Sequence, residues 1–201
     1  MKLTNKTQYY LSAIVLFLFL LRTSSHAQTY FGLHFEPFVY GTNIDKQIYF
    51  PPPSLTNEHS TEASFETAFS FSFKVSEDIK ISLRPGFIFT GNLYTGIDGA
   101  IYGSYFLSSR SYIMSGINTH IEGGGGGNTY SGEDATIPYM VVGYGYYLSK
   151  KIPLELQFNY PLNQEKYGRY RELFSMYPYT VWHYYKVAWM IKLSIGVEWE
   201  L

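Results

Sequence analysis

The last residues of the chain, 187–201, alternate between two kinds of side chain. Every second position is large and apolar, and these positions are Val187, Trp189, Ile191, Leu193, Ile195, Val197, Trp199 and Leu201. A period of two is typical of a β-strand with one apolar and one polar face. Strands of globular proteins usually run about 5 to 6 residues, whereas a strand that crosses a bilayer needs about 9 to 11. This alternation therefore predicts a membrane-spanning strand, and with it a transmembrane β-barrel.

The chain begins like a secretory signal peptide. Two lysines precede an unbroken apolar run at 11–21, and residues 25–27, Ser-His-Ala, supply the small side chains that a signal peptidase recognises. The apolar run is shorter than the roughly 20 residues of a helical membrane span, so we expect cleavage rather than an uncleaved anchor helix. We therefore expect residues 1–27 to be removed and residues 28–201 to form a single domain.

Composition narrows the class of protein further. The chain contains no cysteine, which excludes disulfides, thiolate metal sites and a lipoprotein anchor. Its formal net charge is −1, and removal of the signal segment takes away Lys2, Lys6 and Arg22, so no basic surface for nucleic acid is expected. Aromatic residues make up 19% of the chain and include 21 tyrosines, which suits the interfacial girdles of membrane proteins and also sugar-binding surfaces. After residue 21 no apolar stretch is long enough for a helical span, which leaves a barrel as the membrane-spanning fold.

Seven segments upstream repeat the alternating pattern, so that eight antiparallel strands are expected in all. The seven lie within residues 30–40, 63–75, 79–89, 99–107, 112–121, 136–148 and 154–160. The segment 99–107 is apolar on both faces, and its register stays open between two outward sets: Ile101, Tyr105 and Leu107, or Tyr102 and Phe106. The parity of the terminal strand continues upstream to Tyr179, which predicts that this strand begins early and projects beyond the membrane.

The connections between the expected strands alternate in length. Short turns at 76–78, 108–111 and 149–151 separate longer connections at 41–62, 91–98, 123–134 and 161–177. We interpret 41–62 as an irregular loop, because it contains three consecutive prolines, and 123–134 as a flexible loop opened by five glycines. Short turns on one side and longer loops on the other are typical of a closed up-and-down barrel in an outer membrane.

A soluble, periplasmic lipocalin-like barrel that binds a ligand also has eight strands and is an alternative from another class. Its apolar face would surround the ligand, and its other face would have to be dense in charge. The second face of these strands is instead rich in serine, glycine, alanine, threonine and asparagine. This composition suits a narrow interior and favours the membrane barrel.

With this strand count and terminal strand, the chain resembles the small eight-stranded outer-membrane β-barrels of the OmpA transmembrane-domain and OmpX type, including such barrels from Bacteroidetes-like bacteria. The resemblance covers residues 28–201 and implies a location in the cell outer membrane, in contact with its lipids. In that family the alternating last strand is the recognition signal for the barrel-assembly machinery. The residues that would carry this signal here are Trp189, Ile191, Leu193, Ile195, Val197, Trp199 and Leu201. The chain departs from the family by ending in leucine rather than in an aromatic residue.

The inward faces of the expected strands carry charged residues of both signs. An eight-stranded barrel is only wide enough for side chains, so a wide pore is not expected. Buried charges are costly unless they are paired, which predicts a salt-bridged polar network in the lumen, with a gated or proton-conducting path as the alternative. The residues expected in this network are His34, Glu36, Glu66, Arg84, His120, Glu155 and Lys192, and the same inward faces carry Lys74, Lys80, Glu198 and Glu200.

The sequence carries no metal-binding or cofactor-binding motif, and we expect neither a cofactor nor catalysis. The alternative function is a lipopolysaccharide- or lipid-modifying enzyme, for which His120 with Glu122 is the best candidate. A cluster within 161–177 mixes cations with aromatic rings and is a candidate contact patch for a protein or glycan: Lys166, Tyr167, Arg169, Tyr170 and Arg171. We therefore expect a structural or surface-interaction role through the long extracellular loops.

Overall fold

The computed structural model describes residues 28–48, 54–89, 94–123, 130–133, 135–173 and 180–201. The expected signal peptide lies outside these residues. The described residues form one sheet of ten strands: β1 (Gln28–Ile48), β2 (Ser54–Lys74), β3 (Ile79–Ile88), β4 (Gly96–Phe106), β5 (Ser111–Glu122), β6 (Tyr130–Gly132), β7 (Thr136–Ser149), β8 (Ile152–Pro161), β9 (Gly168–Leu173) and β10 (Thr180–Glu200). No helix within the described ranges is long and apolar enough to cross a membrane.

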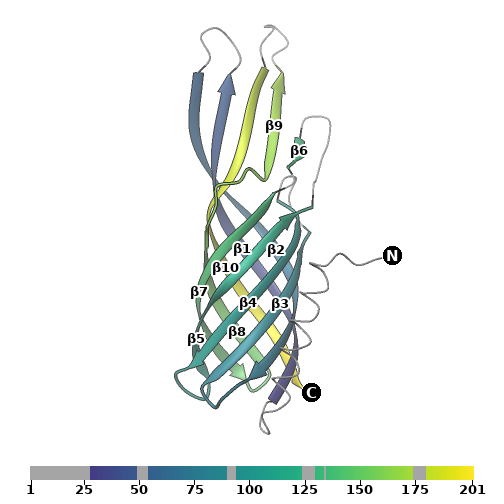
Figure 1. Cartoon of the computed structure of the whole chain (residues 1–201), viewed down its shortest axis with the longest axis vertical. Coiled ribbons are helices and arrows are strands. Elements are labelled where there is room, and N and C mark those ends of the chain that lie inside the picture. Colours follow the sequence, from purple (N-terminus) through teal and green to yellow (C-terminus); the bar gives the residue numbers. More distant parts are fainter. Residues whose placement is uncertain (1–27, 49–53, 90–93, 124–129, 134, 174–179) are drawn as a thin grey trace, which may run out of the picture.

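Eight of these strands close into a barrel (Figure 1). The order is β1-β2-β3-β4-β5-β7-β8-β10, each pair is antiparallel, and β10 returns to pair with β1. The closing register runs from Tyr30 opposite Glu200 to Ile48 opposite Val181. Closure removes the free edges that an open sheet would expose. The prediction of a closed eight-stranded antiparallel barrel is confirmed.

The outside of the barrel is apolar and its inside is polar. Exposed apolar side chains occur on every barrel strand, for example Leu33, Phe71, Phe87, Ile101, Ile117, Val142, Phe158 and Ile195. The register that stayed open in 99–107 is settled by Ile101, which is 59% exposed, and Tyr102, which is 1% exposed. A soluble barrel needs the reverse arrangement, with polar groups outside. The lipocalin-like alternative therefore does not fit this structure.

All four of the longer connections expected from the sequence contain strand residues. Outside the membrane a strand needs no apolar stripe, so most of these extensions carried no sequence signal. Residues 41–48 and 54–62 are not an irregular loop: β1 and β2 pair without interruption from Gln28 opposite Lys74 to Ile48 opposite Ser54, and the three prolines lie outside the described residues. The connection 161–177 contains β9, and β6 lies in the expected glycine-rich loop. β4 begins at Gly96, inside the expected loop 91–98.

The parity of β10 changes at one position. Gly41 of β1 lies opposite Trp189 and the next residue, Thr42, lies opposite Val187, so that Ala188 is an extra residue, as in a β-bulge. Val187 is 2% exposed and Met190 is 0% exposed, which places odd positions inward above the bulge and even positions inward below it. The prediction that Val187 and its upstream parity face outward is therefore wrong. Tyr179 itself lies outside the described residues.

Part of the sheet, made of β1, β2, β9 and β10, continues past the rim of the barrel (Figure 1). We define the projecting sheet as residues 42–48 of β1, 54–64 of β2, 168–173 of β9 and 180–187 of β10. Its strand order is β2-β1-β10-β9, and β6 pairs with part of β9. β3 pairs with β2 only from Glu66 onward, so this sheet does not close. The short turns and the C-terminus lie at the opposite end, the turn end (Figure 1).

Candidate functional site

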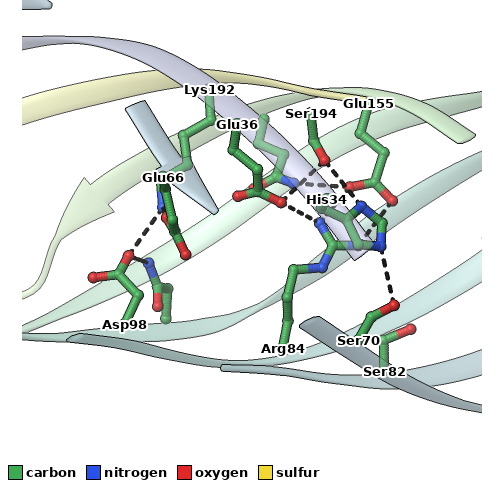
Figure 2. A network of polar contacts seen from close by, with 12 residues as sticks. His34, Glu36, Glu66, Ser70, Ser82, Arg84, Asp98, Glu155, Lys192 and Ser194 are labelled. Carbon is green, nitrogen blue, oxygen red and sulfur yellow. Dashed lines mark hydrogen bonds and ion pairs between the residues drawn. The ribbon is translucent and has the colours of Figure 1, made fainter. Parts of the chain in front are cut away.

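Arg84 of β3 joins strands from opposite sides of the lumen. Its Nη1 donates to Oε1 of Glu36 at 2.8 Å and to Oε2 of Glu155 at 2.7 Å, and Nη2 donates to Oε1 of Glu155 at 3.1 Å (Figure 2). These three side chains are at most 3% exposed. The planar guanidinium suits such a bridge, because its donors match two carboxylates at once. One cation on β3 therefore links β1 and β8 across the lumen.

His34 of β1 lies beside this ion pair. Its Nδ1 is 3.2 Å from Oγ of Ser194 and its Nε2 is 3.0 Å from Oγ of Ser70, so both ring nitrogens have partners (Figure 2). Ligand atoms of His34, Glu36 and Glu155 lie within 4.8 Å of one another, which is close enough to hold a metal ion. The Arg84 guanidinium already engages both carboxylates and would repel a metal cation. We therefore assign these residues to an ion-pair network rather than to a metal centre.

A second cluster surrounds Lys192 of β10. Its ammonium group donates to Glu66 and to Oδ2 of Asp98, the latter at 3.0 Å. Asp98 also contacts Nδ1 of His120 at 2.6 Å and accepts a hydrogen bond from Nδ2 of Asn118 at 2.7 Å. Sequence reasoning missed Asp98, because it placed this residue in a loop. The available signal was the alternation of apolar Ile97 with polar Asp98. An expected strand that began at residue 96 would have placed the Asp98 carboxylate in the lumen.

Glu122 completes the second cluster at the end of β5. Its Oε2 lies 3.2 Å from Nε2 of His120, and its Oε1 accepts hydrogen bonds from the backbone and hydroxyl of Thr95. Both ring nitrogens of His120 therefore face carboxylates. His120 is 0% exposed. The histidine that sequence reasoning chose as the best enzymatic candidate is thus enclosed.

A third ion pair lies near the turn end. Lys80 donates to Oε1 of Glu198 at 2.9 Å and to the hydroxyl of Tyr147 at 2.8 Å, and that hydroxyl donates to Oε2 of Glu198 at 2.6 Å. A cavity of about 610 Å³ opens beside these three residues. Lys74 and Glu200, expected on the inward faces, line its mouth, and Glu200 is exposed. The lumen is thus open to solvent at the turn end, beside this ion pair.

Buried tyrosines fill the other end of the lumen. Tyr94 stacks on His120 with ring centroids 4.2 Å apart, and its hydroxyl lies 2.9 Å from that of Tyr139. Tyr94 and Tyr167 form a T-shaped pair with ring centroids 5.2 Å apart. All of them, with Tyr40, are at most 2% exposed. Burial raises the pKa of Tyr167 above its usual value, so this phenol stays neutral. We call Tyr40, Tyr94, Tyr139 and Tyr167 the tyrosine layer; it separates His120 from the projecting end.

The expected contact patch divides in the structure. Tyr167 belongs to the tyrosine layer and is not at the surface, which corrects that expectation. Tyr170 lies on the same sheet face as His183, with ring centroids 5.4 Å apart. Lys166, Arg169 and Arg171 instead contact aromatic rings of β10 on the other face. Sequence alone could not separate these residues, because no strand was expected there.

All seven residues expected in the lumen network lie inside the barrel and are at most 3% exposed. Six of them form two clusters, with Glu36, Arg84 and Glu155 in one and Glu66, His120 and Lys192 in the other. His34 joins the first cluster through Ser194, which donates to Oε1 of Glu36 at 3.0 Å. The charged residues of both clusters are thus paired with groups of opposite charge.

Comparisons with known proteins found matches among solved structures, whereas no family model and no curated protein matches the chain. The N-terminal β-barrel domain of Pseudomonas aeruginosa OprF is 14% identical, with 84% of this chain and 97% of that chain covered and a TM-score of 0.43. OprG from the same organism is 9% identical, with coverages of 87% and 97% and a TM-score of 0.46. Neisserial surface protein A is 10% identical, with coverages of 85% and 97% and a TM-score of 0.38.

The fold assignment rests on this chain's own geometry. Eight antiparallel strands close on themselves, apolar side chains cover the outside, and paired charges fill the inside. A closed barrel also satisfies every strand edge, which a bilayer requires. By strand number, closure and polarity, the chain is a small eight-stranded β-barrel of the outer-membrane type.

Proposed function

We propose that this protein resides in the outer membrane and acts by contact through its projecting sheet, rather than by transport or catalysis through its lumen. The observation that carries the proposal is the filling of the lumen. Two ion-pair clusters occupy its middle, and the tyrosine layer covers them at the projecting end. The projecting sheet, in contrast, carries aromatic and charged side chains on the face that continues the outside of the barrel, among them Trp182, Tyr184 and Arg169.

Export and assembly form part of the proposal. Residues 1–27 would direct export, and the outward side chains of β10 would be recognised by the barrel-assembly machinery. From Ile191 to Val197 these side chains are between 38% and 47% exposed, as recognition and later contact with lipid both require. Trp199 and Leu201 extend the stripe to the turn end at 42% and 76%.

Planar-bilayer recording tests the closed lumen. The purified, folded barrel should give no stepwise conductance in concentrated potassium chloride. A variant with Arg84→Ala and Tyr94→Ala, which removes one cluster's cation and part of the tyrosine layer, should show conductance steps that the unmodified protein lacks. Stable conductance steps from the unmodified protein would contradict the proposal and favour the gated path.

An enzyme that modifies outer-membrane lipids is the rival function. Against it stands the position of His120, whose ring nitrogens face Asp98 and Glu122 and whose ring lies under Tyr94. A lipid substrate would have to displace the tyrosine layer to reach it. The two functions separate in a deletion strain: an unchanged lipid profile supports the contact role, and a lipid species that reappears with the unmodified gene but not with His120→Ala would establish the enzyme.

A further inference from the structure

The two faces of the projecting sheet differ in what they adjoin. β1 has no bulge in its pairing with β2, so its odd residues keep one direction along the whole strand. Leu33, Phe35 and Val39 are on the exposed apolar outside of the barrel, and Asn43, Asp45 and Gln47 continue that face upward. We call this the outer face of the projecting sheet. It is the direct continuation of the lipid-facing surface.

The cross-strand register places two aromatic residues of β10 on the outer face. Trp182 lies opposite Gln47 of β1 and Arg171 of β9, and Tyr184 lies opposite Asp45 and Arg169. Tryptophan and tyrosine are the residues enriched where membrane proteins leave the hydrocarbon and enter the headgroup region. Both rings therefore lie above the apolar belt of the barrel, on the sheet face that continues its lipid-facing surface.

Cations lie against both rings. The Lys166 ammonium is 3.6 Å from the centroid of the Tyr184 ring, and the guanidinium groups of Arg169 and Arg171 are 5.2 Å and 5.7 Å from the Trp182 ring. A cation–π contact orients each lysine or arginine side chain, and the side chain keeps its positive charge. Five residues from β10, β9 and the segment before β9 therefore form one surface, which we call the cation–aromatic patch.

Positive charge remains on this patch after its ion pairs are counted. Arg169 pairs with Glu133 at 3.1 Å, and the neighbouring Lys186 pairs with Asp45 at 2.7 Å. No ion pair within the described residues involves Lys166 or Arg171. The nearby acid Glu172 instead contacts His183 on the other face. Among the described residues these two cations have no acidic partner, which leaves their charge for an anion from outside the protein.

We propose that the cation–aromatic patch binds the phosphate groups of the anionic glycolipids that surround the barrel in the outer leaflet. Its continuity with the lipid-facing belt brings it to the headgroups, and its charge is complementary to phosphate. Guanidinium groups bind phosphate through paired hydrogen bonds, and clustered Lys and Arg beside a membrane bind anionic lipids. The inference rests on the proposed outer-membrane location and names the partner of the projecting sheet.

Binding can be measured through Trp182. The chain has three tryptophans, so Trp189→Phe with Trp199→Phe leaves Trp182 as the only one. The folded protein in zwitterionic detergent is titrated with purified lipopolysaccharide, with the same lipid after dephosphorylation, and with inorganic phosphate. The fluorescence of Trp182 should change only with the phosphorylated lipid. Lys166→Ala with Arg171→Ala should weaken this binding roughly tenfold or more.

The matched control is Lys150→Ala with Lys151→Ala, which removes two exposed cations at the turn end and should leave binding unchanged. Heat-modifiable gel migration verifies that each variant is folded, and calorimetric titration of proteins with all three tryptophans repeats the comparison. Equal binding of the phosphorylated and dephosphorylated lipids, or an unchanged affinity in the patch variant, would overturn the inference. A response to inorganic phosphate at the same concentration would assign the site to free anions instead. A conducting lumen, which refutes the proposed function, would show in bilayer recordings and not in this titration.

Discussion

The barrel below Ala188 and the projecting sheet above it share three strands, β1, β2 and β10, but differ in which side chains face outward. In the barrel the apolar residues face outward and the charged residues are enclosed, as with Leu193 and Lys192 on neighbouring positions of β10. In the projecting sheet Val187 is buried and the cations of β9 lie on the outer face. The same chain therefore meets an apolar medium in one region and a polar one in the other. The extra residue Ala188 reverses which side chains of β10 face outward between the two regions.

The ion pairs of the two regions also differ in what they contribute. Lys186 and Asp45 in the projecting sheet are 24% and 22% exposed, and pairs open to solvent contribute about 0–1 kcal/mol. Arg84, Glu36 and Glu155 are almost fully enclosed, and a buried charge without its partner is strongly unfavourable. The lumen network therefore specifies one arrangement of strands, whereas the pairs of the projecting sheet are dispensable for folding.

The largest expected effect follows from removing the central cation of the barrel. Arg84→Met leaves Glu36 and Glu155 buried without a counter-charge and should lower the free energy of unfolding by about 3 to 5 kcal/mol. Urea unfolding in lipid vesicles, followed by tryptophan fluorescence, measures this loss. Lys186→Met, which breaks the Lys186–Asp45 pair of the projecting sheet, should cost about 1 kcal/mol or less. Similar losses in both variants would break the distinction between the regions.

The next largest effect is expected when a charge is added to the lipid-facing outside of the barrel. Ile117 is 46% exposed in the middle of β5, so Ile117→Arg would place a cation in the hydrocarbon and should cost about 2 to 4 kcal/mol. Asn57 is exposed on the outer face of the projecting sheet, where Asn57→Arg should have little effect. The same vesicle unfolding assay compares them. If Ile117→Arg were tolerated as well as Asn57→Arg, the outside of the barrel would not face lipid.

The junction between the regions should be sensitive to a single methyl group. A Cβ atom on Gly41 would lie 2.3 Å from Nε1 of Trp189, whereas a Cβ on Gly99 would meet no atom within 4 Å. Gly41→Ala should therefore destabilise by about 1 to 3 kcal/mol, as overpacking does, while Gly99→Ala should not. Restoration of part of the loss by Trp189→Leu in a double-mutant cycle would locate the effect at this contact. Equal behaviour of the two alanine variants would contradict it.

Shortening the projecting sheet should have the smallest effect on folding. Thr42 and Ser60 are paired, so an Asn-Gly turn can join them in place of residues 43–59. The shortened protein should migrate as a folded, heat-modifiable barrel with a nearly unchanged urea midpoint. Failure of this variant to fold, with the same turn tolerated at residues 76–78, would show that the projecting sheet is part of the barrel's folding unit.

The sequence predicted the barrel more completely than the projecting sheet, and the reason is physical. An apolar medium selects an apolar side chain at every second position, so the stripes from Phe65 to Phe73 and from Ile191 to Trp199 could be recognised directly. Above the membrane both faces of a strand meet polar surroundings, and residues 54–62 show no such stripe. The alternation along each strand predicted which residues face the lumen. It could not predict which of them form pairs, because the partners come from strands far apart in sequence. The pairing of Arg84 with Glu155, and the inward position of Tyr167, required the closed structure.

The parity change at Ala188 divides the molecule, and a single-cysteine scan of β10 tests it most directly. The chain contains no cysteine, so each position from 181 to 199 can be replaced in turn and spin-labelled in lipid bilayers. The structure predicts access to lipid-soluble oxygen at 191, 193, 195 and 197, protection at 181, 183 and 187, and access to a water-soluble relaxation reagent at 182, 184 and 186. An alternation that keeps one phase from 181 to 199, or oxygen access at the even positions of the barrel, would contradict this account.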